Sequence, residues 1–332
     1  MVNEMISTEL NTFKSSSLNR KKRVLITGAL GHIGSLLIHS FQPSEFDEVI
    51  LLDNLSTQRY CSLFNLPQGV PFRFVEADIC NDDLEKHFIG IDIVIHFAAI
   101  TNAAASFEIQ EQVEKVNFHG TQRVAEACIA CGCKLLFPST TSVYGTQAEV
   151  EDENCGEDEL KPQSPYATSK LRAEQLLQSL EKSSGLQFVI CRFGTIFGTS
   201  IGMRFHTAVN KFVWQACVGQ PLTVWRTAMN QKRPYLDLND AIRAIRFIIA
   251  TNRFDQQIYN VLTINATVAE IISTIEKNIP DLRVEYVDAV IMNQLSYTVA
   301  CDKFQALGFN FEGSLERGVS ETIQLICRVR QI

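Results

Sequence analysis

The chain has 332 residues, of which 46% are hydrophobic and 20% are charged, so it can bury a large core without a metal or a disulfide. Its formal net charge of −7 argues against nucleic acid as a partner, because phosphate backbones attract basic surfaces. The sequence has no apolar run of about 18 residues, so it predicts no membrane-spanning helix.

The N-terminus and the cysteines indicate where the protein works. Residues 1–21 are polar and lack the apolar segment of a secretory signal, which predicts a loose N-terminal tail. The ten cysteines do not have the paired spacing of a zinc site, although residues 128–133 read CIACGC. We therefore expect no metal and a reducing, cytoplasmic location.

The first part of the chain alternates predicted strands with predicted helices. Continuous apolar runs are typical of strands that are buried on both faces of a parallel sheet. Such runs cover residues 23–27, 48–53, 72–79, 92–99, 134–140 and 187–194. Helical spacing of apolar residues covers residues 32–42, 107–131 and 165–183. This alternation predicts an α/β fold with a Rossmann-type doubly wound parallel sheet over residues 22–195.

After about residue 195 the segments become shorter and more mixed. A helix is predicted over residues 204–220, a strand over 222–225, and a final helix from Ser314. We expect residues 196–332 to form a smaller C-terminal α/β lobe that binds the substrate, with some exchange of chain between the two lobes.

Residues 27–34 read TGALGHIG, between the first predicted strand and the first predicted helix. Gly28 allows a tight turn, Gly31 allows the backbone to approach a pyrophosphate, and Gly34 allows the helix to pack on the strand. The helix N-terminus then presents unpaired N–H groups to the phosphates. The motif therefore predicts a dinucleotide site.

Asp53 ends the second predicted strand. A carboxylate there can accept hydrogen bonds from the adenosine ribose and would repel a 2′-phosphate, which favours NAD over NADP. The alternative is that Asp53 only caps the turn that follows it.

Further motifs occur in a recognisable order: ADI at 77–79, HFAA at 96–99, VNFHGT at 116–121, STTSVYG at 139–145 and YATSK at 166–170. With the glycine motif, they resemble the extended short-chain dehydrogenase/reductases. The subgroup that the chain looks most like is the NAD-dependent nucleotide-sugar epimerase/dehydratase family.

The resemblance implies which residues contact NAD. In similar proteins Asp78 and Ile79 would hold the adenine, while Asn117 would brace the active-site end of the long helix. The residues expected at the cofactor are Gly28, Leu30, Gly31, His32, Ile33, Gly34, Asp53, Asn54, Asp78, Ile79, Phe97, Ala98, Ala99, Asn117, Tyr166 and Lys170.

Tyr166 and Lys170 are one helical turn apart and therefore share a face of the helix. The ammonium is expected to lower the pKa of the tyrosine, which could then act as general base toward a sugar hydroxyl. The resemblance adds Thr140 as the residue that bonds the reacting hydroxyl. We therefore expect Tyr166, Lys170 and Thr140 to be catalytic.

The next two residues distinguish between reactions. Similar dehydratases and decarboxylases carry an acid directly after the Ser/Thr or one place later, but here these positions are Thr141 and Ser142. Elimination of water needs an acid and a base near C5 and C6, whereas an epimerase needs neither.

The resemblance also suggests residues that bind the substrate. Arg233 would hold its diphosphate, which suits a guanidinium fork. The other expected contacts are Thr141, Ser142, Thr195 and Arg204. Thr195 replaces an Asn common in such epimerases, and Asp237 replaces a common His, so the identity of the sugar stays open.

The predicted function is an NAD-dependent nucleotide-sugar epimerase that acts at C4 of a UDP-sugar through a transient 4-keto intermediate. A dehydratase or reductase on the same scaffold is one alternative, and a non-catalytic NAD-binding sensor is another. A homodimer is expected, paired through the helices at 108–131 and 165–183. Their apolar residues include Ile109, Val113, Val116, Leu176, Leu177 and Leu180.

Overall fold

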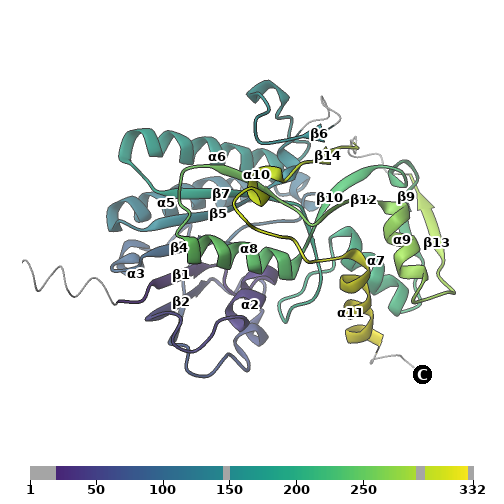
Figure 1. Ribbon diagram of the computed structural model, residues 1–332, viewed down its shortest axis with the longest axis horizontal. Helices are drawn as coiled ribbons and strands as arrows, with labels where there is room; N and C mark the ends of the chain where they lie inside the picture. The colour runs from purple at the N-terminus through teal and green to yellow at the C-terminus, as the bar shows by residue number, and fades with distance from the viewer. Residues whose placement is uncertain (1–19, 145–149, 289–295, 328–332) are drawn as a thin grey trace, which may run out of the picture.

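A seven-stranded parallel sheet forms the larger lobe of the computed structural model, which describes residues 20–144, 150–288 and 296–327 (Figure 1). The strand order is β11-β7-β5-β4-β1-β2-β3, which confirms the predicted Rossmann-type doubly wound sheet. The strands are β1 (Arg23–Thr27), β2 (Glu48–Asp53), β3 (Phe72–Glu76), β4 (Ile93–His96), β5 (Lys134–Thr140), β7 (Phe188–Phe193) and β11 (Ile258–Val261).

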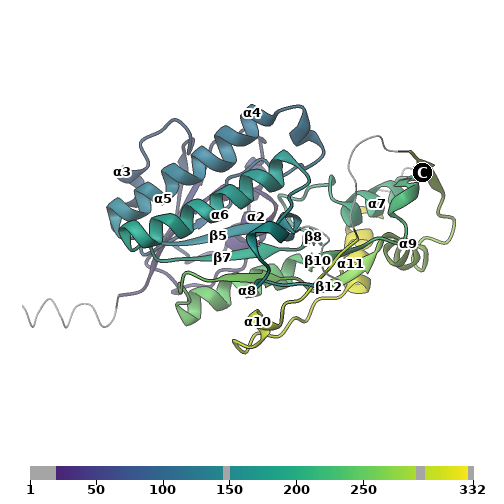
Figure 2. The same ribbon diagram turned by 90° about the horizontal axis from the view of Figure 1, so that it is seen from above.

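Helices cover both faces of this sheet (Figure 2). One face packs on α2 (His32–His39) and α8 (Leu238–Thr251), and the other on α5 (Gly120–Cys131) and α6 (Pro165–Ser184). Alternate residues of β1 show the division, since Ile26 belongs to the first core and Leu25 to the second. The continuous apolar strands are explained by this double burial.

The long helix predicted over 107–131 has a break near its middle. It consists of α4 (Gln110–Val113), a π-helical segment η3 (Glu114–His119) and α5. Such π segments often lie at functional sites. Asn117 lies in this one, and its side chain bonds the backbone N–H and carbonyl of Ile100 at 2.8 and 2.9 Å. The segment therefore fixes the chain that leaves β4.

The smaller lobe contains short strands and three longer helices. Its three-stranded sheet has the order β12-β10-β8, and β9 pairs with β13. The bounds are β8 (Thr195–Phe197), β9 (Leu222–Trp225), β10 (Lys232–Asp237), β12 (Ile264–Thr267), β13 (Val284–Val287), α7 (Ala208–Cys217), α9 (Val268–Glu276) and α11 (Leu315–Cys327). The predicted helix from 204 begins only at Ala208, because residues 199–206 form a loop.

Short elements complete the chain. They are β6 (Val150–Glu151), β14 (Thr298–Val299), α3 (Glu85–Phe88), α10 (Asp302–Gln305), and the single turns η1 (Tyr60–Leu63), η2 (Ala105–Phe107), η4 (Thr141–Val143), η5 (Glu157–Glu159) and η6 (Arg226–Ala228). The predicted tail lies outside the described residues, apart from Arg20 and Lys21.

The chain crosses between the lobes after residue 195. Strand β11 pairs with β7 at the edge of the large sheet, and α8 packs on α2. Phe304 and Phe309 also belong to the core of the larger lobe. The predicted boundary at 195/196 therefore does not separate the two lobes completely, because segments after it complete the larger lobe. Some exchange of chain between the lobes is expected from the sequence.

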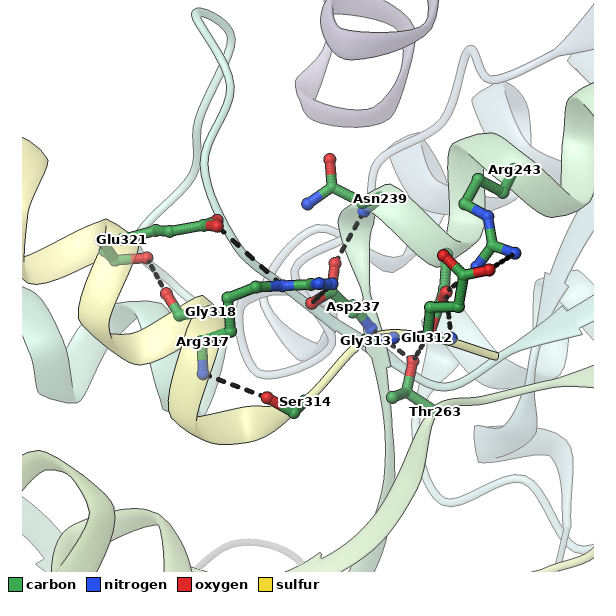
Figure 3. Close-up of polar contacts among 12 residues, drawn as sticks. Asp237, Asn239, Arg243, Thr263, Glu312, Gly313, Ser314, Arg317, Gly318 and Glu321 are labelled. Carbon is green, nitrogen blue, oxygen red and sulfur yellow. Dashed lines mark hydrogen bonds and ion pairs between the residues drawn. The ribbon is translucent and has the colours of Figure 1, made fainter. Parts of the chain in front are cut away.

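The last helix is connected to the end of β10 (Figure 3). Figure 3 shows Arg317 of α11 reaching toward Asp237, with 3.7 Å between nitrogen and oxygen. The Asp237 carboxylate also accepts the backbone N–H of Asn239 at 2.8 Å and so caps α8. The aspartate that replaces the family's common His thus links β10, α8 and α11.

The predicted dimer helices use part of their apolar surface within the protomer. Val113 and Leu177 are buried within their own chain, so they do not contribute to an exposed apolar surface on these helices. Val116, Leu176 and Leu180 are half-buried and Ile109 is exposed, so they remain available. Dimerisation stays a prediction that rests on this smaller set.

Within the described ranges, none of the helices has the length and apolar character needed to cross a bilayer. The same residues contain no group of three or more His, Cys, Asp or Glu side chains that could hold a metal ion.

Candidate active site

A cavity of about 740 Å³ lies where the carboxyl ends of the large sheet meet the smaller lobe. Ligands of open α/β sheets bind at this edge, and the volume is at the upper end for ligand pockets. The cavity extends from Asp53 and Asp78, at the ends of β2 and β3, past Tyr166 to Arg233 in the smaller lobe. The cavity therefore brings together the residues predicted at the cofactor and those predicted at the substrate, although they are far apart in the sequence.

The glycine-rich turn forms one wall of this cavity. Gly28 has φ +63°, a left-handed conformation that favours glycine. A Cβ at Gly28 would lie 2.6 Å from the Ala98 backbone nitrogen, so the turn packs directly against the end of β4. A Cβ at Gly34 would lie 2.5 Å from the Ala29 carbonyl oxygen. Both glycines thus allow the close packing that the motif predicts.

Gly28→Ala is expected to destabilise the fold by about 1–3 kcal/mol and to weaken NAD binding, because it combines backbone strain with a clash. Gly185→Ala is the matched control, since Gly185 has φ +70° but nothing within 4 Å of an added Cβ. Urea unfolding of both variants separates the two effects. Equal losses in both would show that the contact with Ala98 has no energetic role.

Asp53 connects the end of β2 to the glycine-rich turn. Its two carboxylate oxygens accept the backbone N–H groups of Leu30 at 3.1 Å and Leu55 at 2.9 Å. Asp53 therefore also caps the turn that follows β2, by accepting the Leu55 N–H, which is the alternative expected from the sequence. A carboxylate has further lone pairs, so Asp53 can still accept ribose hydroxyls while it supports the turn.

The other residues predicted at the cofactor divide into two groups. Most line the cavity: Gly28, Gly31, His32, Ile33, Gly34, Asp53, Asn54, Asp78, Ile79, Phe97, Ala98, Ala99, Tyr166 and Lys170. Leu30 and Asn117 are not in the lining. Leu30 is buried and acts through its backbone, while the Asn117 side chain donates to the Ser169 hydroxyl at 3.1 Å.

These features fit an NAD molecule. Gly28, Gly31 and Gly34 leave the turn without side chains at three positions, and Asp53 lines the same cavity. A 2′-phosphate beside the Asp53 carboxylate would be repelled, so the unphosphorylated dinucleotide is the better match.

Tyr166 lies at the start of α6, whose N-cap is Ser164. Burial raises the pKa of Tyr166 to about 12, and a hydrogen bond with Thr140 and the charge of Arg204 oppose this rise. Thr140 ends β5 and also accepts the Ser142 backbone N–H at 3.1 Å. The predicted pair of Thr140 and Tyr166 is thus brought together in the cavity wall.

Lys170 is buried one turn further along α6. Its Nζ donates to the Pro138 carbonyl at 2.9 Å and lies 4.4 Å from the centre of the Phe137 ring. Burial lowers the pKa of Lys170 to about 7, against the opposing charge of Glu174. The effect of Lys170 on the acidity of Tyr166 stays a prediction.

The buried lysine should make stability depend on pH. The pKa of Lys170 is about 7 in the folded chain against an ordinary 10.5, so between these values the unfolded chain binds the extra proton. Stability should therefore rise with pH over that range, as the cost of the buried charge is relieved. We expect the free energy of unfolding of the unmodified protein, relative to Lys170→Met, to increase from pH 7 to pH 10.

Chemical denaturation at several pH values measures this difference, and the other titrating groups cancel between the two proteins. A difference that is flat or falls with pH would mean that Lys170 stays charged when folded.

The residues predicted at the substrate are not all at the cavity. Ser142, Thr195, Arg204 and Arg233 line it. Thr141 does not, because its hydroxyl donates to the Phe193 carbonyl at 3.3 Å and the residue is buried. The prediction that Thr141 contacts the sugar is therefore wrong.

Acidic groups in the cavity wall are confined to one end. Among the described lining residues, the carboxylates are Asp53 and Asp78, at the ends of β2 and β3. The lining also contains the hydroxyls of Ser139, Thr140, Ser142 and Thr195 and the cations Lys170 and Arg204. A described carboxylate is thus absent from the end of the cavity where chemistry would occur.

Two residues beside the catalytic group were not predicted. Glu174 follows Lys170 by four positions, and its carboxylate forms a buried ion pair with Arg192 at 2.7 Å. The i, i+4, i+8 spacing of Tyr166, Lys170 and Glu174 could have revealed it. Thr101 receives a hydrogen bond from Arg204, and no sequence signal indicates this contact across the cavity.

A sequence model of the NAD dependent epimerase/dehydratase family matches residues 24–261. The trifunctional UDP-glucose 4,6-dehydratase/UDP-4-keto-6-deoxy-D-glucose 3,5-epimerase/UDP-4-keto-L-rhamnose-reductase of Arabidopsis thaliana is 30% identical over 322 residues, covering 91% of this chain and 46% of the relative. The chain therefore spans about half the length of the curated relatives that it matches first.

Other similar proteins match over most of their length. The dTDP-D-glucose 4,6-dehydratase of Mus musculus is 28% identical, with 91% of this chain and 88% of the relative covered. The crystal structure of UDP-glucuronic acid 4-epimerase from Bacillus cereus, in complex with UDP-glucuronic acid and NAD, has a TM-score of 0.83 at 27% identity. That match covers 93% of this chain and 100% of the other. The chain belongs to the NAD-dependent epimerase/dehydratase family.

Proposed function

We propose that this protein is a nucleotide-sugar 4-epimerase that uses NAD and acts on a UDP-sugar. The observation that carries the proposal is that the carboxylates among the described lining residues are Asp53 and Asp78, at the ends of β2 and β3, and that none of the described lining residues beside Tyr166 in the sequence is acidic. Dehydration requires a positioned acid and base at C5 and C6, whereas epimerisation at C4 requires only oxidation, turning and reduction of one carbon.

The similar structure from Bacillus cereus supports the substrate class. It is a 4-epimerase bound to a UDP-sugar and NAD, and this chain covers all of it. Dehydration remains the second candidate, because the mouse relative that matches over most of its length is a dehydratase.

The residues of this chain have the following proposed roles. Tyr166 takes the proton of the sugar 4-hydroxyl and later returns it, while Thr140 holds the reacting oxygen. Lys170, fixed by the Pro138 carbonyl, adds positive charge one helical turn away. Arg233, which lies 4.9 Å from the centre of the Tyr297 ring, holds the sugar diphosphate while the sugar turns.

When bound, NAD would accept the hydride that leaves C4 of the sugar, and its positively charged ring would favour the Tyr166 phenolate. Since the same hydride returns to the sugar, the reaction consumes no external oxidant.

The test is to incubate the purified protein with NAD and a panel of UDP-sugars in deuterated water, and to identify products by NMR. A 4-epimerase should give the C4 epimer without solvent deuterium on carbon, because hydride transfer does not exchange with water. A 6-deoxy-4-keto product, or deuterium at C3 or C5, would establish proton abstraction from carbon and contradict the proposal.

A further inference from the structure

The loop at residues 199–206 leaves the smaller lobe and lies on the glycine-rich turn. The Ser200 hydroxyl is 2.7 Å from His32 Nδ1, and the Gly202 N–H donates to the Ser35 hydroxyl at 3.0 Å. A Cβ at Gly202 would lie 2.7 Å from the Leu30 carbonyl oxygen. The loop therefore covers the turn at close contact, and it needs glycine there.

Two nitrogen atoms at this contact have no hydrogen-bond partner and are shielded from solvent. They are Nε2 of His32 and Nε of Arg204, and both residues line the cavity. A third, on the Arg59 guanidinium, is buried beside them although Arg59 is not in the described lining. The guanidinium nitrogens are donors, and Nε2 of His32 is a donor when the Ser200 hydroxyl donates to Nδ1. Burying donors without partners is unfavourable, so this cluster is suited to receive an acceptor.

The cluster is rich in positive charge. Burial and the charge of the nearby Arg59 lower the pKa of Arg204 to about 10. The charge of Arg204 also interacts with Asp53 and with Tyr166, so the guanidinium lies within electrostatic range of both ends of the cofactor region. A dinucleotide that joins these ends has its pyrophosphate in the middle, between the two nucleosides.

We propose that Arg204 and His32 form a diphosphate clamp that holds the pyrophosphate of the dinucleotide, with loop 199–206 as its cover. A guanidinium suits paired phosphate oxygens. Arg233, which lies toward the substrate, remains the anchor for the sugar nucleotide. The inference reassigns Arg204 from the substrate to the cofactor, and it rests on the proposed cofactor site but not on the proposed reaction.

The two possible sources of a diphosphate can be separated by binding measurements with NAD and with UDP. We expect Arg204→Gln to weaken NAD binding by about 10- to 100-fold, the value of a charge-assisted hydrogen bond, and to leave UDP binding unchanged. Isothermal titration calorimetry measures both ligands. Arg283→Gln is the matched control, because Arg283 is exposed and donates to the Gly219 carbonyl away from the cavity lining.

A second variant tests the cover without removing a charge. Gly202→Ala should displace the loop from the Leu30 carbonyl and weaken NAD binding, again with UDP binding unchanged. Adenosine monophosphate provides a further arm, since it lacks a diphosphate and should lose less affinity than NAD in both variants.

Loss of UDP affinity with NAD affinity retained would assign Arg204 to the sugar nucleotide and overturn the proposal. Unchanged affinity for both ligands would overturn it as well. Failure of the proposed epimerase reaction would appear only in the products, so the two proposals can fail separately.

Discussion

The Tyr166→Phe variant should lose about 10²- to 10⁴-fold in turnover, the range for removing a positioned general acid–base group. Phenylalanine keeps the ring in the cavity wall but cannot take or return the hydroxyl proton. The variant should keep its fold and its affinity for NAD, because Ser164 and Pro165 begin α6 independently of the Tyr166 hydroxyl.

The measurement is steady-state turnover of the UDP-sugar identified in the product panel, together with NAD affinity by calorimetry. Tyr286→Phe is the matched control, since Tyr286 is exposed on β13 and lies outside the cavity lining. Turnover of Tyr166→Phe within a few-fold of the unmodified protein would exclude Tyr166 as the acid–base group. Loss of NAD affinity in the same variant would point to a binding role instead.

The pH dependence of turnover should reveal where the acidity of Tyr166 comes from. Its pKa is raised to about 12 by burial, although Thr140 and Arg204 oppose the rise. Burial also lowers the pKa of Lys170 to about 7, so we expect the positive ring of a bound cofactor to contribute to the ionisation of Tyr166. In its proposed role, Tyr166 is therefore expected to depend on the charge of the bound cofactor.

The sheet could be predicted from the sequence because its signals are local. The apolar runs of β1, β2, β4, β5 and β7 cannot be accommodated on a half-exposed sheet, and TGALGHIG marks the first crossover. Position in the parallel sheet then brings the ends of these strands to one edge. The residues that depend only on this placement, such as Gly28, Asp53 and Phe97, were correctly expected at the cavity.

The features that the sequence did not predict depend on contacts between distant segments. Strand β11 is short and apolar, a pattern that fits either sheet, and only its pairing with β7 decides between them. The π segment at 114–119 contains Asn117, whose bonds to Ile100 join two segments that are 17 residues apart. Thr141 follows a strand end, where a small change of backbone direction decides whether its hydroxyl faces the cavity or Phe193.

Glu174→Gln is expected to lower the free energy of unfolding by about 3–5 kcal/mol, the cost of leaving a buried charge unpaired. Glu174 and Arg192 have side chains that are only 1% and 3% exposed, and the Arg192 guanidinium donates to both carboxylate oxygens. Burial alone would lower the pKa of Arg192, but the charge of Glu174 raises it overall, so the arginine stays ionised. The variant would thus retain the cation and remove its partner.

Urea unfolding gives the difference, and Glu114→Gln is the matched control. Glu114 pairs with Arg172 on the surface, where the loss should stay below about 1 kcal/mol. The double variant Glu174→Gln with Arg192→Met should recover part of the loss, because it removes the buried charge together with its partner. No recovery would show that the packing of these side chains matters more than their charges.

The pair also connects the stability of the fold to the catalytic helix. Glu174 lies one turn after Lys170 and raises the pKa of that lysine against the effect of burial. The Ser139 hydroxyl, next to the Pro138 carbonyl that holds Lys170, donates to the same carboxylate. Removing the negative charge should therefore lower the pKa of Lys170 further and shift the high-pH limb of turnover to lower pH, because Lys170 acts as a cation in its proposed role. The double variant should recover part of the free energy of unfolding but not the original pH profile of turnover. A neutral glutamine at position 174 cannot replace the negative charge that raises the pKa of Lys170.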